Sequence, residues 1–133
     1  LESGYMLAQV TAAALASENK TLSHPASVDS ITTSAGQEDF VSMAPWAGQK
    51  ALQIAENTAT ILAIELMISA TATQTFLKDS HPSSVSRDIF REINTRLNYN
   101  AGDRPLNKEI EGLKKMIVTG KLTEIVKRRI DLN

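Results

Sequence analysis

The sequence of 133 residues contains no cysteine and few aromatic side chains, which make up 5% of the chain. Without cysteine the protein can form neither a disulfide framework nor a zinc–thiolate site, and it has no cysteine nucleophile. The alternation of apolar and polar residues that is typical of β-strands is nearly absent. Apolar residues recur at helical spacing along the whole chain instead, and this pattern predicts an all-α fold.

A strong net charge is also missing, because 14 lysines and arginines face 15 aspartates and glutamates. This balance indicates that neither nucleic acid nor an anionic membrane is a main partner. No apolar run reaches the roughly 18–20 residues needed to cross a bilayer, and the first residues do not form a secretory signal. We therefore expect a cytoplasmic protein with no membrane segment. Since the chain begins with Leu1 rather than methionine, we interpret it as a fragment or a cleaved product.

The charges are unevenly distributed along the chain. Residues 1–77 carry two basic and seven acidic side chains, whereas residues 78–133 carry twelve and eight. A helix on the surface of a small monomer needs a charged outer face. The sparse charge of residues 1–77 therefore predicts apolar bundle helices that pack against other protein on most sides. Residues 78–133 are predicted to form ordinary amphipathic helices within the same continuous helical unit.

The apolar spacing predicts five helices. The first two cover residues 4–18 and 40–76, and the second would be on the order of 55 Å long at 1.5 Å per residue. The third begins after Ser84, which we expect to be its cap, the fourth opens at Pro105, and the fifth begins near Thr123.

The stretch ATILAIELMISA, residues 59–70, has three polar members, one of which is Glu65. A helix that is apolar on all sides is buried on all sides, so we expect this one inside a multi-helix, multi-subunit bundle. There Glu65 would need a hydrogen-bonding or cationic partner, because an unpaired buried carboxylate is costly. A membrane span fits less well, given the length of the run and its carboxylate.

Residues 21–39 are rich in small polar and turn-forming residues and are predicted to form a functional loop. The loop ends in the sequence Gln37-Glu38-Asp39-Phe40. We expect Asp39 to cap the following helix, since its oxygens can accept the free amide protons of the first turn. Glu38 has two interpretations. It either complements the helix dipole together with Asp39, which spacing alone favours, or it binds a cationic group or acts as a general base.

Motifs for other kinds of site are missing from the sequence. It contains no HExxH motif, no glycine-rich phosphate loop and no serine-centred nucleophile elbow. The two histidines, His24 and His81, lie far apart in the sequence and each precedes a proline. We interpret them as turn residues and expect no metal site.

Three runs of the sequence carry a family pattern. They are GYMLAQVTAAALASENKTLSHPASVDSITTSAGQEDFVSM at residues 4–43, AENTATILAIEL at residues 55–66 and, more loosely, DRPLNKEIEGLKKMIVTGKL at residues 103–122. Together they resemble the C-terminal part of the aromatic amino acid ammonia-lyases, and most closely the histidine ammonia-lyases. The resemblance implies the all-α, long-helix bundle of the fumarase- and aspartase-like fold and a cytosolic homotetramer. It also implies elimination of ammonia from an amino acid substrate.

The resemblance further implies a protein-derived cofactor. The family forms a methylidene-imidazolone ring from an internal Ala-Ser-Gly, and this tripeptide does not occur in the sequence. Nor is there a counterpart of the family's N-terminal half, which carries the catalytic tyrosine loop. We therefore expect the chain to be inactive alone and to form one wall of an active site whose ring comes from other polypeptide.

Two residues match the family's active-site positions. Glu38 matches its active-site glutamate, which implies a catalytic and substrate-binding role, and Gln37 matches a neighbouring position that lines the substrate pocket. An acid in place of Glu38 is typical of histidine-specific members, which form urocanate, whereas plant-type phenylalanine-specific members have an amide. Histidine lyases commonly have histidine in place of Phe40, so tyrosine and phenylalanine lyases and aminomutases stay open. A helical module that only oligomerises, without catalysis, is a further alternative.

Overall fold

The computed structural model describes residues 3–77, 79, 81–99 and 102–131. Within these ranges the chain forms five α-helices and two short 3₁₀ turns, and no strand. The prediction of an all-α fold is confirmed. The helices are α1 (Met6–Leu22), α2 (Ala44–Phe76), α3 (Ser84–Asn94), α4 (Asn107–Val118) and α5 (Lys121–Lys127), and the turns are η1 (Ala26–Val28) and η2 (Ser34–Gly36).

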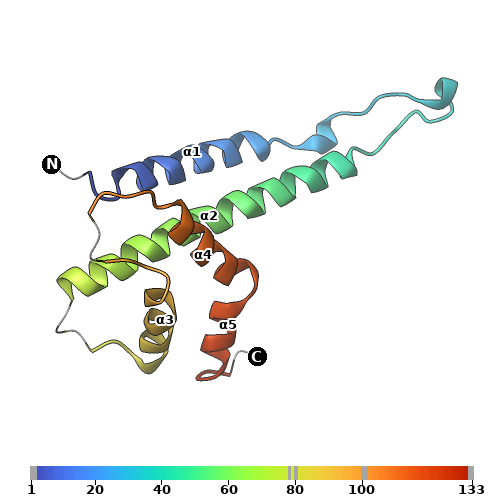
Figure 1. The fold of residues 1–133 in the computed structure, drawn as a ribbon. Helices are drawn as coiled ribbons and strands as arrows, with labels where there is room; N and C mark the ends of the chain where they lie inside the picture. Colours follow the sequence, from blue (N-terminus) through green and yellow to red (C-terminus); the bar gives the residue numbers. More distant parts are fainter. Residues whose placement is uncertain (1–2, 78, 80, 100–101, 132–133) are drawn as a thin grey trace.

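The long helix α2 is the spine of the molecule. α1 runs alongside it in the opposite direction, and α4 packs across it (Figure 1). α3 contacts α2 near its C-terminal end, and α5 packs against α3 and α4. The chain between α1 and α2 leaves this bundle as a long arm. The arm projects from one end of the molecule, and α3, α4 and α5 lie at the other end (Figure 1).

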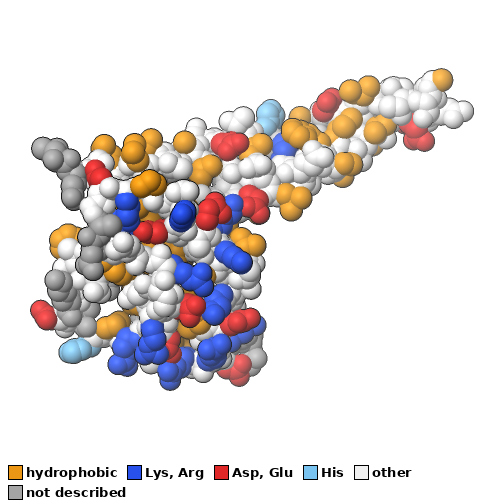
Figure 2. All heavy atoms as spheres, viewed as in Figure 1, with side chains coloured by type: hydrophobic (Ala, Val, Ile, Leu, Met, Phe, Trp, Pro, Cys, Tyr) orange, Lys and Arg blue, Asp and Glu red, His pale blue; other side chains and the backbone are white. Residues whose placement is uncertain are grey.

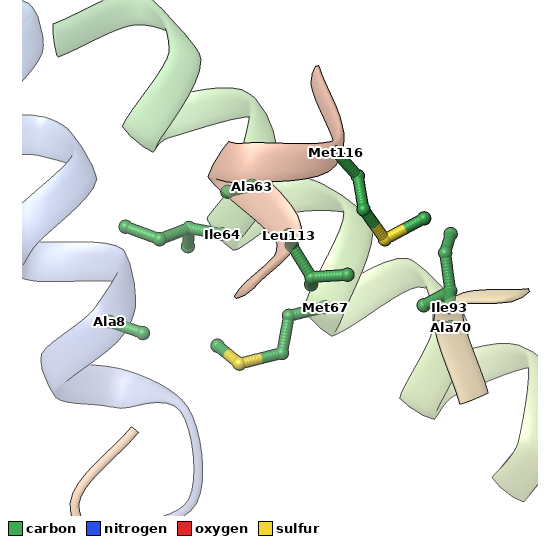
Figure 3. Close-up of a cluster of buried hydrophobic side chains, with 8 residues drawn as sticks. All are labelled: Ala8, Ala63, Ile64, Met67, Ala70, Ile93, Leu113 and Met116. Carbon is green, nitrogen blue, oxygen red and sulfur yellow. The ribbon is translucent and has the colours of Figure 1, made fainter. Parts of the chain in front are cut away.

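A single hydrophobic core joins the first two helices to the last three. Its buried side chains come from α1, α2, α3 and α4 and meet around the middle of α2 (Figure 3). Met67 of α2 and Leu113 of α4 are completely buried where the two helices pack against each other. The core members are Ala8, Ala63, Ile64, Met67, Ala70, Ile93, Leu113 and Met116.

The described residues cover only one face of α2. The residues of that face recur at helical spacing and include Ala59, Ala63 and Met67, all buried. On the other side Leu62 is 42% exposed and Glu65 is also exposed. Within the described residues α1 and α4 reach only one side of residues 59–70, so this chain by itself does not bury the stretch on all sides. Enclosure of the remaining face by other polypeptide stays a prediction.

By length and composition, α2 could also cross a membrane. An 18-residue window of this 33-residue helix has a mean hydropathy of 1.3, and 28% of the window is buried inside the molecule. The sequence-based argument that the apolar stretch is too short is thus corrected. One such helix remains weak evidence, because long apolar helices of enzyme bundles meet the same criteria.

The start of α2 differs from the prediction. The helix begins at Ala44 rather than at residue 40, and Met43 occupies the cap position without a side-chain hydrogen bond. Pro45 explains this start, because proline suits the first turn of a helix, where its missing N–H is not needed. Asp39 therefore does not cap α2, and that expectation is wrong.

The end of α1 also differs, since the helix continues to Leu22, four residues beyond the predicted end. A buried amide on α2 accounts for the extension. The side-chain nitrogen of Asn57 donates to Glu18 Oε2 at 2.9 Å and to Asn19 Oδ1 at 3.0 Å, both on the last turns of α1. These hydrogen bonds to α2 stabilise the last turns of α1, where residues such as Asn19 have a low intrinsic helix propensity.

Three later boundaries move by one or two residues. α4 begins at Asn107 rather than at Pro105, with Leu106 in the cap position. Ser83, not Ser84, caps α3, and its Oγ accepts a hydrogen bond from the amide of Ser86 at 3.2 Å. α5 begins at Lys121 rather than near Thr123, because the left-handed Gly120 (φ 73°) both ends α4 and starts α5. Lys78, at the predicted boundary between residues 1–77 and 78–133, lies outside the described residues, as does Leu1.

A carboxylate latch holds the start of α1 against the segment that leads into α4. The amide and hydroxyl of Ser3 donate to Asp103 Oδ2 at 2.8 and 3.0 Å, and the amide of Gly4 donates to Oδ1 at 3.0 Å. These bonds, first of all that from the Ser3 amide, lower the pKa of Asp103 below its usual value of 3.8. The latch joins residues almost a hundred positions apart.

The pKa of Asp103 predicts an acid-dependent contribution to stability. Because the carboxylate is favoured in the folded state, its contribution is fully present above pH 3.8 and is lost as the pH falls through the lower folded-state pKa. We expect Asp103→Asn, which keeps one acceptor oxygen, to lower the melting temperature at neutral pH and to melt like the wild type well below pH 3.8.

Asp131→Asn is the matched control, since this exposed carboxylate accepts no hydrogen bond from the described residues. It should leave the melting curve unchanged at every pH. A difference between the Asp103→Asn variant and the wild type that stays constant down to strong acid would contradict the latch.

Candidate active site

The arm between α1 and α2, residues 23–43, carries the predicted site residues. It extends beyond the paired ends of the two helices and places its turn far from the bundle of α3, α4 and α5 (Figure 1). Residues 29–40 are all exposed, including the large apolar side chains of Ile31 (62%) and Phe40 (72%). Figure 2 shows the arm as a narrow projection with hydrophobic side chains on its surface. It has no apolar core of its own.

The base of the arm is fixed to α2. The ammonium group of Lys50 donates a hydrogen bond to the backbone carbonyl of His24 and lies 6.0 Å from the centre of the Trp46 ring. Pro25 and Met43 line the same hollow, whose volume is about 390 Å³. The arm therefore leaves the helices in a defined direction.

The tip of the arm is a tight turn closed by backbone hydrogen bonds. The amide of Thr33 donates to the carbonyl of Glu38 at 3.0 Å, and the amide of Glu38 donates back at 3.3 Å. Between them Ser34, Ala35 and Gly36 have φ values of 54°, 55° and 90°. A left-handed backbone suits the glycine but costs about 1–2 kcal/mol at a residue with a Cβ atom. Such strain is often found at functional sites.

The predicted site residues follow directly after this turn. Glu38 has its backbone held by Thr33, while its carboxylate is exposed and bonds to none of the described residues. Gln37 lies beside it, and the backbone amide of Gln37 donates to the carbonyl of Ser34 at 3.2 Å. Asp39 is exposed as well. The turn brings Gln37 and Glu38 together at the end of the arm, but this chain builds no pocket around them.

The arrangement can present a carboxylate and an amide to a ligand that other polypeptide encloses. Carboxylates bind cationic groups or accept protons, and amides can donate and accept hydrogen bonds. Among the described residues no group of three or more histidine, aspartate or glutamate side chains could hold a metal ion.

Ser30 is a contributor to this geometry that the sequence did not single out. Its hydroxyl accepts a hydrogen bond from the amide of Val41 at 2.9 Å and donates to the carbonyl of Val41 at 3.2 Å. The two residues lie on the two opposing segments of the arm, residues 29–33 and 38–42, which are named its strands although they form no β-sheet. Serine in a polar loop carries no distinguishing sequence signal, so only the structure could show this contact.

Comparison with known proteins decides the family. A family model described as aromatic amino acid lyase matches residues 1–95 of the chain. The chain belongs to the aromatic amino acid lyase family. The matched region contains α1, α2, α3 and the arm with Gln37 and Glu38.

Curated relatives of this chain include histidine ammonia-lyases. That of Natranaerobius thermophilus is 43% identical over 130 residues, which cover 98% of this chain and 25% of the relative. That of Shewanella sediminis is 48% identical over 119 residues, covering 90% and 23%. The chain thus spans about a quarter of the length of the curated relatives it matches.

Solved structures of the lyase family share the fold. Histidine ammonia-lyase from Trypanosoma cruzi is 38% identical and superposes with a TM-score of 0.88, over 96% of this chain and 25% of its own. Tyrosine aminomutase from Streptomyces globisporus is 26% identical and superposes with a TM-score of 0.91, over 100% and 25%. The predicted helical fold of the ammonia-lyases is confirmed.

The strained turn of the lyase arm yields a prediction at Ala35. Valine there should open the turn, because a β-branched residue tolerates φ 55° poorly, whereas glycine should keep it closed. We expect limited proteolysis within residues 30–41 to be roughly three- to tenfold faster in Ala35→Val than in the wild type. Ala35→Gly is the matched control and should be cut no faster than the wild type. Equal cleavage rates for the valine and glycine variants would contradict the strain.

Proposed function

We propose that this chain forms one wall of the active site of an enzyme that eliminates ammonia from L-histidine to give trans-urocanate. The observation that carries the proposal is the position of Glu38. The family-matched arm ends in a turn that holds the backbone of this residue and leaves its carboxylate free for a ligand. Between 43% and 48% of the aligned residues are identical to those of three curated proteins named histidine ammonia-lyase.

The chemistry of histidine suits a carboxylate at this place. An imidazole or ammonium group can pair with Glu38 or give it a proton. A plain phenyl ring offers no such partner, so a desolvated carboxylate beside it would lose free energy. Gln37, next in the turn, would line the same pocket and could hydrogen-bond the substrate.

The elimination also needs an electrophile, which the family forms from Ala-Ser-Gly. This tripeptide does not occur in the chain, so the methylidene-imidazolone would come from polypeptide outside it. The exposed, polar pair at the arm tip fits a place beside such a group, since neither side chain is engaged by the described residues. When present, the ring supplies the electrophilic chemistry. The arm contributes binding and proton transfer at Glu38, and the isolated chain should be inactive.

The surface of the chain supports assembly with other polypeptide. Met6, Leu7 and Val10 of α1 are between 54% and 68% exposed, and Leu52 of α2 is 71% exposed. Large exposed apolar side chains gathered on one turn of a helix, as on α1, are typical of an interface. We therefore include in the proposal a cytoplasmic oligomer, most simply a homotetramer, together with the remaining three-quarters of the enzyme.

A second candidate is a lyase or aminomutase acting on tyrosine. Two observations favour it: the superposition on a tyrosine aminomutase with a TM-score of 0.91, and Phe40, which replaces the histidine common in histidine lyases. Sequence identity points the other way, at 26% against 43% or more for the curated histidine lyases. A role in oligomerisation alone would apply if the complete protein lacked the Ala-Ser-Gly tripeptide.

Glu38→Gln in the complete enzyme tests the proposal. We expect turnover of histidine to fall by at least about tenfold, or about 1.4 kcal/mol in the barrier, because an amide can neither accept the proton nor pair with a cation. The assay follows the absorbance of urocanate, with coumarate and cinnamate formation measured in parallel to identify the substrate.

Asp39→Asn is the matched control, since it removes the neighbouring exposed carboxylate and should leave turnover unchanged. Equal turnover of Glu38→Gln and wild type would remove Glu38 from the mechanism. Formation of coumarate but not urocanate by the wild type would favour the second candidate.

A further inference from the structure

The two strands of the arm are joined at only two places among the described residues. One is the backbone pair of Thr33 and Glu38, and the other is the contact of Ser30 with Val41. The two contacts share one register. Ser30 lies three residues before Thr33, and its partner Val41 lies three residues after Glu38. No backbone hydrogen bond joins the two strands between these places.

Nearer the base of the arm, the Ser30 side chain joins the two strands in place of a backbone hydrogen bond. It accepts from the Val41 amide at 2.9 Å and donates to the Val41 carbonyl at 3.2 Å, so it uses both its capacities on one residue of the opposite strand. Alanine cannot replace either bond. Threonine keeps the hydroxyl and suits an extended strand.

Packing cannot perform this task in the arm. Residues 29–40 are exposed, so the cross-strand hydrogen bonds alone set the pairing of the strands within this chain. The register matters for Glu38 because a slip of one residue turns every side chain of a strand to its opposite face. The carboxylate would then point away from the ligand.

We propose that Ser30 is a positioning residue for Glu38. Its hydroxyl extends the pairing that begins at Thr33 and Glu38, and so helps to fix the register of the arm and the face to which the Glu38 carboxylate points. The inference rests on the proposed function, since in it Ser30 acts only through Glu38.

A double-mutant cycle in the complete enzyme tests this role. Ser30→Ala should lower kcat for histidine by about tenfold, because misplacing a reacting group by about an ångström is costly. Ser30→Thr should stay within about twofold of the wild type, as it keeps the hydroxyl. In a Glu38→Gln background, Ser30→Ala should add less than about twofold, because the group that it positions is already gone.

Ser27→Ala is the matched control, since this exposed serine of the same arm makes no hydrogen bond with the described residues. It should leave kcat unchanged. An equal loss from Ser30→Ala in both backgrounds would overturn the proposal, and a variant that merely misfolds would give that result. Unchanged kcat in Ser30→Ala, or no rescue by threonine, would also overturn it. If Glu38→Gln itself had no effect, the proposed role of Glu38 would fail, and the same cycle would show this separately.

Discussion

The packing of α2 against α1 and α4 is the interaction on which the rest of the structure depends. Met67 and Leu113 are completely buried where α2 meets α4. In the N-terminal half of α2, Asn57 bonds to Glu18 and Asn19 of α1. This packing covers one face of α2 and leaves Leu52 and Leu62 exposed on the rest of the helix. A helix of 33 residues with one apolar side uncovered is suited to a larger bundle than this chain can build.

The same constraint explains why the arm can carry a site. α1 packs along α2, and Lys50 fixes the base of the arm to this helix pair through the carbonyl of His24. Beyond that base the arm has no core, so only hydrogen bonds and a left-handed turn shape the segment around Glu38. Loops held by a rigid scaffold are a common place for catalytic groups. In the proposed enzyme, the surface that encloses α2 would also enclose the arm.

Much of the fold could be predicted from the sequence, because apolar spacing reports which side of a helix is buried. It predicted five helices and the extent of α2 at its C-terminal end. Apolar spacing did not predict boundaries that other features determine. Pro45 lies in the first turn of α2, so the helix starts at Ala44 and Asp39 does not cap it. Asn57 bonds to the end of α1, which is longer than predicted. The turn after Thr33 and the Ser30 contact were also missed, since left-handed alanine and a cross-strand hydroxyl leave no pattern in a polar loop.

The most direct test of the account is an experimental structure of the complete enzyme with a bound histidine analogue. We expect neighbouring polypeptide to cover the exposed face of α2 and a Glu38 carboxylate oxygen to lie within about 3.2 Å of a nitrogen of the ligand. A structure in which the arm extends into solvent and Glu38 lies far from every ligand would contradict it.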